Sequence, residues 1–358
     1  MSARRVIILG AGKIGGAIVD LLSETGDWEV SVADQSAEFL ELIPTDRATH
    51  LIVDVSDRAQ LTAAIDGHEY AISALPFFLN PLVATVCRDV GVHYFDLTED
   101  VETTRTVRHI AAGANTVFIP QCGLAPGFIS IVGYDLTKRF DRLREVRMRV
   151  GALPQYPVDT LKYNLTWSTD GLINEYCNPC EAIHEGRVVE MLPLERLESF
   201  SLDGMDYEAF NTSGGLGTLC ETLAGTVDRL DYKTVRYPGH CATMRVLLED
   251  LRLGERRELL KDVLEHAIPI THQDVVLIFV TVSGWRDSRL TQETYAKKVY
   301  AHEVSGRLMS AIQITTAGGI CAMVDMHAQG KLPATGFVRQ EDATLADFMD
   351  NRFGALYA

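Results

Sequence analysis

The sequence predicts an α/β protein: a doubly wound parallel sheet, then a second α+β domain with a mixed sheet. A buried apolar run near the N-terminus leads into a glycine-rich turn. Apolar runs and amphipathic segments then alternate as far as about residue 126, which indicates parallel strands joined by helices. Beyond about residue 140, apolar and polar residues alternate with a period of two, which is typical of strands with one covered face.

The glycine-rich turn follows the apolar run Val6–Leu9 and has dinucleotide-binding spacing, with Gly10, Gly12 and Gly15. The first glycine permits a tight turn, the second lets a pyrophosphate approach the backbone, and the third lets the next helix pack on the strand. That helix begins near Lys13 and Ile14, so its positive end faces the phosphates. In this context the turn predicts a Rossmann-type coenzyme site rather than a merely structural glycine turn.

The second strand, Glu29–Ala33, ends at an acidic residue, Asp34. A carboxylate there accepts hydrogen bonds from the adenosine ribose and repels a 2′-phosphate. Gln35 and Ser36 follow, with no arginine to bind that phosphate. The pattern predicts NAD rather than NADP, although an aspartate before Ser36–Leu40 could also serve as a helix N-cap.

Four further apolar runs predict the other strands of the first sheet: His50–Val53, Tyr70–Ala74, His93–Leu97 and Thr116–Ile119. Helical patterns lie between them, for example at Pro81–Val90 and Val101–Ala112. Ligands of such sheets bind beyond the carboxyl ends of the strands. We therefore expect Asp54 and Val55 to line the adenine. The nicotinamide is expected near Asp96–Glu99 and near Ser73, Ala74, Leu75, Pro76, Cys122 and Gly123.

The second domain is expected to be a mixed sheet with helices. Its strands are predicted at residues 146–150, 161–167, 234–237, 275–283 and 293–302, and its helices at residues 241–251 and 256–266. We place a nucleotide-binding domain at residues 1–126 and a substrate-binding and dimerisation domain at residues 127–306. The apolar helix Arg307–Ala328, within a segment reaching residue 340, is expected to pack back on the first domain.

The composition is that of a globular protein with an acidic excess. Of 358 residues, 47% are hydrophobic and 23% charged, and 49 acidic against 33 basic residues give a formal net charge of −16. This charge argues against nucleic acid or an anionic membrane as partner. The chain has no apolar run long enough to cross a bilayer, and its seven cysteines show no pairing pattern. Because the N-terminus leads straight into a predicted strand, we expect no signal peptide. We expect a cytoplasmic protein with a small-molecule partner.

Cys177 and Cys180 form a Cys-x-x-Cys pair, with His184 four residues further on. At most three ligands would result, fewer than a tetrahedral zinc site needs. The intervening Asn178-Pro179 favours a turn between two ordinary thiols. We predict no metal.

Seven short motifs spread over nearly the whole chain resemble the saccharopine dehydrogenase-like superfamily: Gly10–Gly15, Tyr94–Thr98, Gly123–Gly127, Ser168–Leu172, Asn174–Pro179, Thr212–Leu219 and Arg236–His240. Within it, the compact second domain is most similar to the lysine 6-dehydrogenase branch. The resemblance implies NAD-linked oxidation at a C–N bond. In that branch the lysine ε-amine becomes an imine, which water opens to 2-aminoadipate 6-semialdehyde and ammonia.

This chemistry requires an acid/base group near the reacting amine. His240 is the first candidate, because it follows Tyr-Pro-Gly at a strand-to-helix turn and is expected to titrate near neutrality. Asp96 and Glu99 lie where a cationic amine would approach the nicotinamide. Alternatively, His240 begins a helix and bonds to backbone, and either carboxylate caps the helix that starts near Asp100.

A substrate carboxylate requires a cation, for which Arg236 and Arg245 are the candidates. Thr212 and Ser213 could supply donors for an anion. Asp170 and Tyr176 complete the predicted substrate residues, although Asp170 could be a helix N-cap. Cys122 has no neighbouring histidine in its motif and is not proposed as a nucleophile.

Two other functions stay open from the sequence. One is the reductive joining of an amine to an aldehyde or keto acid, as in saccharopine or carboxynorspermidine synthesis. The other is a non-catalytic NAD-binding sensor, which the fold alone does not exclude. An apolar sheet face or helix in the second domain would need a symmetric partner, so we expect a homodimer or higher oligomer.

Overall fold

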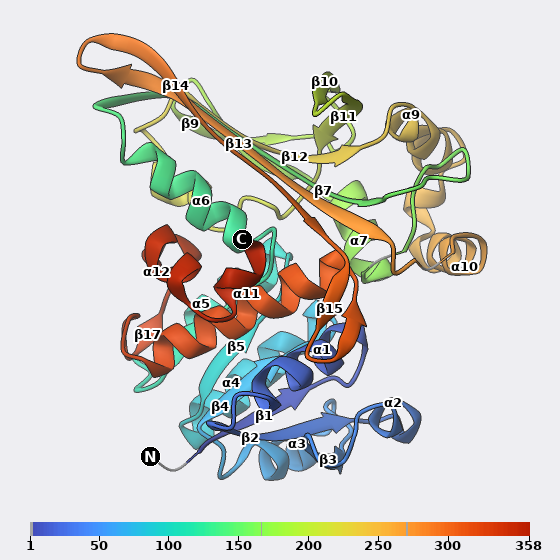
Figure 1. Cartoon of the computed structure of the whole chain (residues 1–358), viewed down its shortest axis with the longest axis vertical. Helices are drawn as coiled ribbons and strands as arrows, with labels where there is room; N and C mark the ends of the chain where they lie inside the picture. The colour runs from blue at the N-terminus through green and yellow to red at the C-terminus, as the bar shows by residue number, and fades with distance from the viewer. Residues whose placement is uncertain (1–2, 166, 270) are drawn as a thin grey trace. The chain divides into compact units, whose positions relative to one another are not determined.

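The computed structural model describes residues 3–165, 167–269 and 271–358. The chain forms two compact units (Figure 1), each described by itself below. Unit 1 extends to Phe128 and also contains Glu303–Arg307 and Gln313–Ala358. Unit 2 contains Ile129–His302 and Leu308–Ile312.

Unit 1 is built on a seven-stranded sheet in which every neighbouring pair is parallel, with the order β17-β6-β5-β4-β1-β2-β3. The chain order reverses on the two sides of β1, which creates the switch point where open α/β sheets bind ligands. This confirms the predicted doubly wound sheet. Its strands are β1 (Arg4–Leu9), β2 (Trp28–Asp34), β3 (Thr49–Ile52), β4 (Tyr70–Ser73), β5 (His93–Asp96), β6 (Val117–Ile119) and β17 (Gly336–Phe337).

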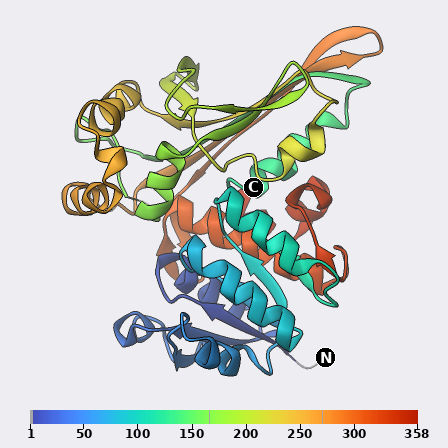
Figure 2. The ribbon, with the colours of Figure 1, turned by 180° about the vertical axis from the view of Figure 1, so that it is seen from behind.

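Helices cover both faces of this sheet. Figure 1 shows α1 and α11 on the near face, and Figure 2, from behind, shows α4 and α5 on the other. Apolar residues at helical spacing explain this packing, for instance the fully buried Ile18 and Leu22 of α1. The helices are α1 (Lys13–Ser23), α2 (Ala37–Glu41), α3 (Arg58–Ile65), α4 (Asn80–Val90), α5 (Val101–Ala111), α11 (Ala311–Ala328) and α12 (Leu345–Asp350), with short η1 (Phe77–Leu79), η4 (Gln340–Asp342) and η5 (Gly354–Tyr357).

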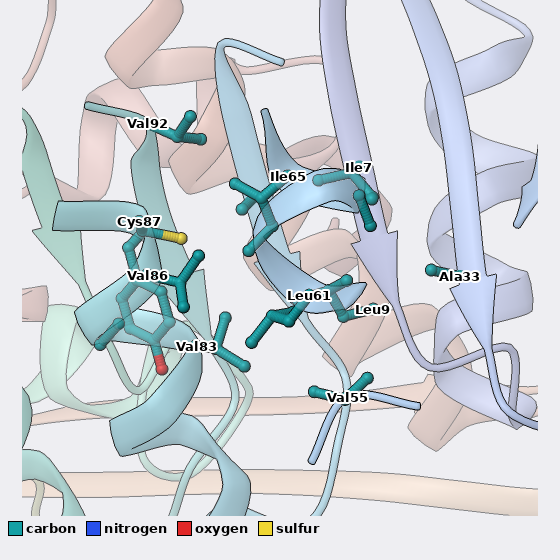
Figure 3. Packing of buried hydrophobic residues seen from close by; sticks show 14 of the residues in the cluster. Ile7, Leu9, Ala33, Val55, Leu61, Ile65, Val83, Val86, Cys87 and Val92 are labelled. Carbon is teal, nitrogen blue, oxygen red and sulfur yellow. The ribbon is translucent and has the colours of Figure 1, made fainter. Parts of the chain in front are cut away.

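The core of unit 1 between the sheet and α3–α5 consists almost entirely of aliphatic side chains. Figure 3 shows Ile7 and Leu9 of β1 facing Leu61 and Ile65 of α3, with Val83 of α4 beside them. These five side chains are inaccessible to solvent. Burying a side chain of this size stabilises the fold by about 1.5–3 kcal/mol, so the core fixes the strand ends that carry the polar residues described below.

Unit 2 is built on a mixed eight-stranded sheet. Six strands follow one another in the order β10-β11-β12-β7-β13-β14, and the β8–β9 hairpin joins the sheet because β8 also pairs with β12. Strands β12 and β7 pair in parallel, and the other neighbours are antiparallel. This confirms the predicted mixed sheet. The strands are β7 (Arg142–Pro154), β8 (Cys180–His184), β9 (Arg187–Met191), β10 (Glu198–Leu202), β11 (Met205–Asn211), β12 (Arg229–Arg236), β13 (Asp274–Arg286) and β14 (Arg289–Tyr300).

Helices lie along one face and at one end of this sheet. They are α6 (Phe128–Thr137), α7 (Thr169–Cys177), α8 (Leu219–Leu223), α9 (His240–Arg245), the π-helical η2 (Val246–Asp250), η3 (Leu253–Glu255) and α10 (Arg257–Ala267). Two short strands, β15 (His302–Val304) and β16 (Arg307–Met309), pair with each other. Among the described residues, none of the helices combines the length and the apolar character needed to span a membrane.

The strand expected at residues 161–167 is wrong: its described residues, 161–165 and 167, are irregular. Tyr163 and Leu165 are buried in a helical core with residues of α7 and α10, such as Leu172 and Leu264. Asn164 between them is buried as well, so the alternation of apolar and polar residues does not correspond here to one covered and one exposed face.

Two predicted helices also have different limits. The helix expected at residues 241–251 is α9 followed by the π-helical η2. The helix expected from Arg307 begins only at Ala311, because β16 comes first and the Asp274 carboxylate accepts the amides of Ala311 at 2.6 Å and Ile312 at 3.0 Å. A carboxylate bound to first-turn amides fixes a helix start as an N-cap side chain would, but it comes from a distant strand.

Candidate functional site

The glycine turn between β1 and α1 has three glycines with three different reasons to be glycine. Gly10 has φ +101°, and a Cβ there would lie 2.8 Å from the Ala74 carbonyl oxygen. A Cβ on Gly15 would lie 1.8 Å from the Gly10 carbonyl oxygen. A Cβ on Gly12 would meet nothing within 4 Å. The first and third glycines are therefore required by the protein's own packing, whereas the space above Gly12 is open.

The N-terminus of α1 is free of side-chain caps. Gly12 is its N-cap residue, and the first turn carries no acidic residue. Amides at such a helix start favour an anion. The turn thus fits the pyrophosphate of a dinucleotide, and the residues that would hold it are Gly10, Gly12, Lys13, Ile14 and Gly15.

Asp34, the last residue of β2, has both carboxylate oxygens fixed by backbone amides. One oxygen accepts Ala11 N at 2.7 Å, and the other accepts Ser36 N at 2.8 Å. The N-cap of α2 is Ser36, which accepts Phe39 N, so Asp34 is not the N-cap. The carboxylate remains partly accessible, and its bond to Ala11 places a negative charge beside the glycine turn.

The other predicted coenzyme residues follow β3 and β4. Asp54 is exposed and accepts Ser56 N at 2.9 Å, while Val55 is buried in the core. Ser73 is buried and donates to the Asn80 amide oxygen at 2.7 Å. Ala74 lies against Gly10 through its carbonyl group, and Leu75 and Pro76 follow it at the same end of the sheet.

Asp96, at the end of β5, is fully buried and surrounded by donors. Its Oδ1 accepts the amides of Thr98 and Gln121, each at 2.9 Å, and its Oδ2 accepts the Tyr94 hydroxyl at 2.6 Å. Burial raises the pKa of Asp96 to about 6, against the opposing effect of these hydrogen bonds. The carboxylate therefore joins the loops that follow β5 and β6. The N-cap of α5 is Asp100, whose side chain accepts a hydrogen bond from Thr103 N at 2.7 Å. Neither Asp96 nor Glu99 therefore caps this helix.

Glu99 and Cys122 lie on these two loops and differ in accessibility. Glu99 is partly exposed, in the irregular stretch before α5. Cys122 is buried, donates to the Ile119 carbonyl at 3.1 Å and contacts the Gln340 amide nitrogen at 3.3 Å. Burial raises the pKa of the Cys122 thiol well above its usual value, and Gly123 follows it in the same buried turn.

In unit 2, three of the predicted site residues, Tyr176, Arg236 and His240, lie together with Tyr163 in one buried polar cluster. We call these four residues the Arg236 cluster. The Arg236 Nε donates to the Tyr176 hydroxyl at 2.9 Å, which lies 3.1 Å from His240 Nε2. The His240 Nδ1 lies 2.7 Å from the Leu161 carbonyl oxygen. Tyr163 presents its ring to the guanidinium, 4.8 Å from its central carbon.

The expectation that His240 titrates near neutrality is wrong. Burial, followed by the charge of Arg236, lowers the pKa of His240 to about 3. An imidazole so placed is neutral at pH 7, and both of its nitrogens have partners. A strand-to-helix turn predicted exposure, but three neighbouring aromatic rings, Tyr163, Tyr176 and Phe210, enclose the side chain.

The remaining predicted substrate residues do not join this cluster through hydrogen bonds. Arg245 is exposed and pairs with Glu249 at 3.1 Å. Asp170 pairs with Lys261 at 2.7 Å, and the N-cap of α7 is Ser168 instead. The Thr212 hydroxyl bonds to that of Thr234 at 2.8 Å, and Ser213 donates to the Pro179 carbonyl at 2.8 Å. The Ser213 hydroxyl proton is therefore occupied, whereas either hydroxyl can be the donor in the Thr212–Thr234 pair.

Sequence reasoning missed Tyr163, because it treated the residue as part of a strand.

The Cys177 and Cys180 thiols are unpaired, and Asn178 and Pro179 connect α7 to β8 between them. Within the described residues, no group of three or more histidine, cysteine or acidic side chains could hold a metal ion.

A Rossmann-type nucleotide unit joined to a mixed-sheet unit defines the class of this protein. Two family models cover nearly all of the chain: the saccharopine dehydrogenase NADP binding domain at residues 6–119 and the saccharopine dehydrogenase C-terminal domain at residues 123–356. The chain belongs to the saccharopine dehydrogenase family.

Individual relatives are distant. The mitochondrial alpha-aminoadipic semialdehyde synthase of Mus musculus is 21% identical over 305 residues, which are 78% of this chain and 31% of that protein. The saccharopine dehydrogenase (NADP(+), L-glutamate-forming) of Schizosaccharomyces pombe is 22% identical over 197 residues, or 52% of this chain and 43% of that protein. This chain thus spans about a third of the length of the first curated relatives it matches.

The fold has a counterpart among solved structures. The apo saccharopine dehydrogenase (L-Glu forming) of Saccharomyces cerevisiae superposes with a TM-score of 0.78 at 16% identity, covering 95% of this chain and 94% of that one. At this identity the match establishes the shared architecture of both units.

Proposed function

We propose that the chain is a nicotinamide-dinucleotide-dependent oxidoreductase that acts at a C–N bond of an amino acid. The observation that carries the proposal is the turn at Gly12, where open space lies above uncapped helix amides in a member of the saccharopine dehydrogenase family. The reaction we propose is oxidative deamination of the lysine ε-amine to 2-aminoadipate 6-semialdehyde and ammonia. A nicotinamide dinucleotide with its pyrophosphate at this turn would supply the hydride acceptor.

The coenzyme we propose is NAD, although the matching family model is described as NADP-binding. Asp34 supports NAD, because two backbone amides fix its carboxylate beside the glycine turn. A fixed negative charge at this position bonds to a ribose and repels a 2′-phosphate. A ratio of kcat/KM for NAD over NADP below one would contradict this assignment.

For the acid/base group we propose Glu99. Asp96 is fully buried and bound by three donors, and His240 is neutral with both nitrogens bonded. Glu99 is the one of the three candidates that stays partly exposed. Glu99→Gln should lower kcat about 100-fold or more, the usual effect of losing an acid/base group. Glu102→Gln, on the exposed face of α5, is the matched control and should leave kcat unchanged.

A second candidate reaction is saccharopine cleavage or its reverse, favoured by the names of the curated relatives. The two are separated by following NADH or NADPH absorbance with lysine, ornithine, other diamines and saccharopine as substrates. Ammonia release with lysine supports deamination, and glutamate release with saccharopine supports the second reaction. Coenzyme binding without turnover of any amine would leave a non-catalytic sensor as the function.

Three further expectations are proposals as well: a homodimer or higher oligomer, no nucleic-acid or membrane partner, and a cytoplasmic location. The first is tested by sedimentation equilibrium of the full chain, where a monomer at micromolar concentration would contradict it.

A further inference from the structure

Gln121 lies in the loop that follows β6 and has a backbone conformation that glutamine rarely adopts. Its φ is +65°, in the left-handed region, which is strained for a residue with a Cβ. The other positive-φ position of the same loop is a glycine, Gly127, which adopts such angles without this strain. Strained backbone of this kind persists only where the surrounding structure imposes it, and it is concentrated at ligand sites.

Hydrogen bonds from two other segments of unit 1 impose this conformation. The Asp96 Oδ1 accepts the Gln121 amide at 2.9 Å, and the Asp96 carbonyl oxygen accepts the Cys122 amide, also at 2.9 Å. From η4, the Gln340 Nε2 donates to the Pro120 carbonyl at 2.8 Å. Three consecutive residues, 120–122, are therefore each bound through their backbone, which fixes the direction in which the Gln121 side chain leaves the loop.

The Gln121 side chain is buried, yet its carboxamide has no partner. The residue is 3% exposed, and in the described part of the chain no group forms a hydrogen bond with its Oε1 or Nε2. The Gln340 carboxamide differs, because its Nε2 contacts two acceptors and its Oε1 is fully enclosed. Neither polar atom of the Gln121 carboxamide is fully enclosed. Since a buried polar group without a partner destabilises the fold, this carboxamide fits a ligand that reaches it from solvent.

Gln121 lies at the edge of the sheet where the coenzyme is proposed to bind. β6 pairs in parallel with β5 and lies on the β4 side of β1, whereas Asp34 ends β2 on the other side. In folds of this kind the coenzyme crosses the carboxyl edge at the switch point. With the adenosine ribose at Asp34, the nicotinamide end extends toward β4, β5 and β6. Its ring carries a primary carboxamide, which pairs with the carboxamide of a glutamine through two hydrogen bonds.

We propose that the Gln121 carboxamide binds the carboxamide of the nicotinamide ring. The Gln121 Nε2 donates to the oxygen of that group, and the Gln121 Oε1 accepts from its nitrogen. Two such bonds stop the ring from turning over, so that one face of the carbon that accepts hydride is directed to the amine. The assignment rests on the proposed function, but only on its coenzyme, and it does not depend on which amine reacts.

The first test compares NADH with its reduced 3-acetylpyridine analogue, in which a methyl group replaces the NH2 of the carboxamide. Calorimetric titration of the full chain gives both dissociation constants for the wild type and for Gln121→Met, which keeps an unbranched side chain of similar length. NADH binding should weaken about tenfold in Gln121→Met and analogue binding about threefold, because the analogue forms only one of the two bonds in the wild type.

Gln292→Met, at an exposed position of β14, is the control for this titration and should change neither constant. An equal loss of affinity for both coenzymes in Gln121→Met, or no loss for either, would overturn the proposal.

The second test separates a ligand-binding role from a structural one. Gln121→Gly removes both the backbone strain and the unpaired carboxamide, so the thermal midpoint of the free protein should stay equal or rise, while NADH binding weakens about tenfold. Arg252→Gly, at an exposed position with φ +55°, relieves strain alone and should leave NADH affinity unchanged. A lower midpoint in Gln121→Gly together with unchanged NADH affinity would assign Gln121 to the fold and contradict the proposal.

Failure of this proposal and failure of the proposed function are distinguishable. NADH binding that depends on Gln121 as described, without oxidation of any amine, supports the assignment and contradicts the enzyme. Oxidation of an amine by Gln121→Met with the kcat/KM of the wild type for NAD supports the enzyme and contradicts the assignment.

Discussion

The Asp96 carboxylate accepts the backbone amide of Gln121 at 2.9 Å, although the two residues lie 25 positions apart. Gln121 has φ +65°, in the left-handed region that non-glycine residues rarely adopt. The same oxygen accepts the amide of Thr98, so one atom fixes the backbone after two neighbouring strands. The backbone conformation at this end of the sheet therefore depends on a side chain that is fully buried.

Asp96 should make stability depend on pH. The folded protein raises the pKa of Asp96 to about 6, above the 3.8 of a free carboxyl, so it binds more protons than the unfolded chain between these values. The free energy of unfolding should then fall by about 3 kcal/mol as pH rises from 4 to 7, relative to Asp96→Asn. Urea titrations of both proteins across this range measure the difference. A constant difference would contradict the prediction.

His327, also in unit 1, should make the free energy of unfolding depend on pH in the opposite direction. Burial, followed by the charge of His93, lowers the pKa of His327 to about 4, and its Nδ1 lies 3.2 Å from the Tyr70 hydroxyl. The unfolded chain then binds the extra proton below about pH 6.5, and stability is lost as pH falls from there toward 4, by up to about 3 kcal/mol. In His327→Gln this loss should be smaller. Identical pH profiles for the two proteins would refute the assignment.

Gly12 and Gly16 offer a matched pair for the coenzyme turn. A Cβ at either position meets nothing within 4 Å, so both alanine variants should fold with a similar thermal midpoint. Gly12→Ala should weaken NADH binding at least tenfold, because its methyl group enters the space of the pyrophosphate. Gly16→Ala should leave the affinity within twofold. Equal affinities in a fluorescence titration would remove Gly12 from the binding site.

Asp34 sets the expected coenzyme preference. Asp34→Ser removes the charge but keeps a hydroxyl acceptor for the neighbouring amides. We expect kcat/KM for NAD to fall about tenfold, or about 1.4 kcal/mol in transition-state stabilisation, and that for NADP to rise. Ser36→Ala, which removes only the cap of α2, is the control. A variant that still prefers NAD by the original factor would show that discrimination lies elsewhere.

The architecture of unit 1 was predictable from local patterns. Each strand is a short apolar run, and the glycine spacing fixes the first turn, so the parallel sheet follows without knowledge of distant contacts. The last strand, β17, was not predicted. It has only two residues, Gly336 and Phe337, and exists because β6 offers a free edge.

The candidate site was less predictable, because its properties depend on tertiary burial. The residue type of His240 indicates titration near neutrality, whereas its surroundings hold it neutral. Tyr163 was assigned to a strand, and its relation to Arg236 joins residues 73 positions apart. Local patterns place polar residues at strand ends, but they do not show which ones the fold encloses.

The seven thiols give each unit its own chemical reporter. Burial raises the pKa values of Cys87 and Cys321 in unit 1 and of Cys220 and Cys241 in unit 2. A thiol reacts with alkylating reagents only as its thiolate, so these sulfurs become modified when the surrounding unit unfolds. Brief exposure to iodoacetamide along a denaturant series, read by peptide mass, would thus record which of the two units melts first without any engineered label.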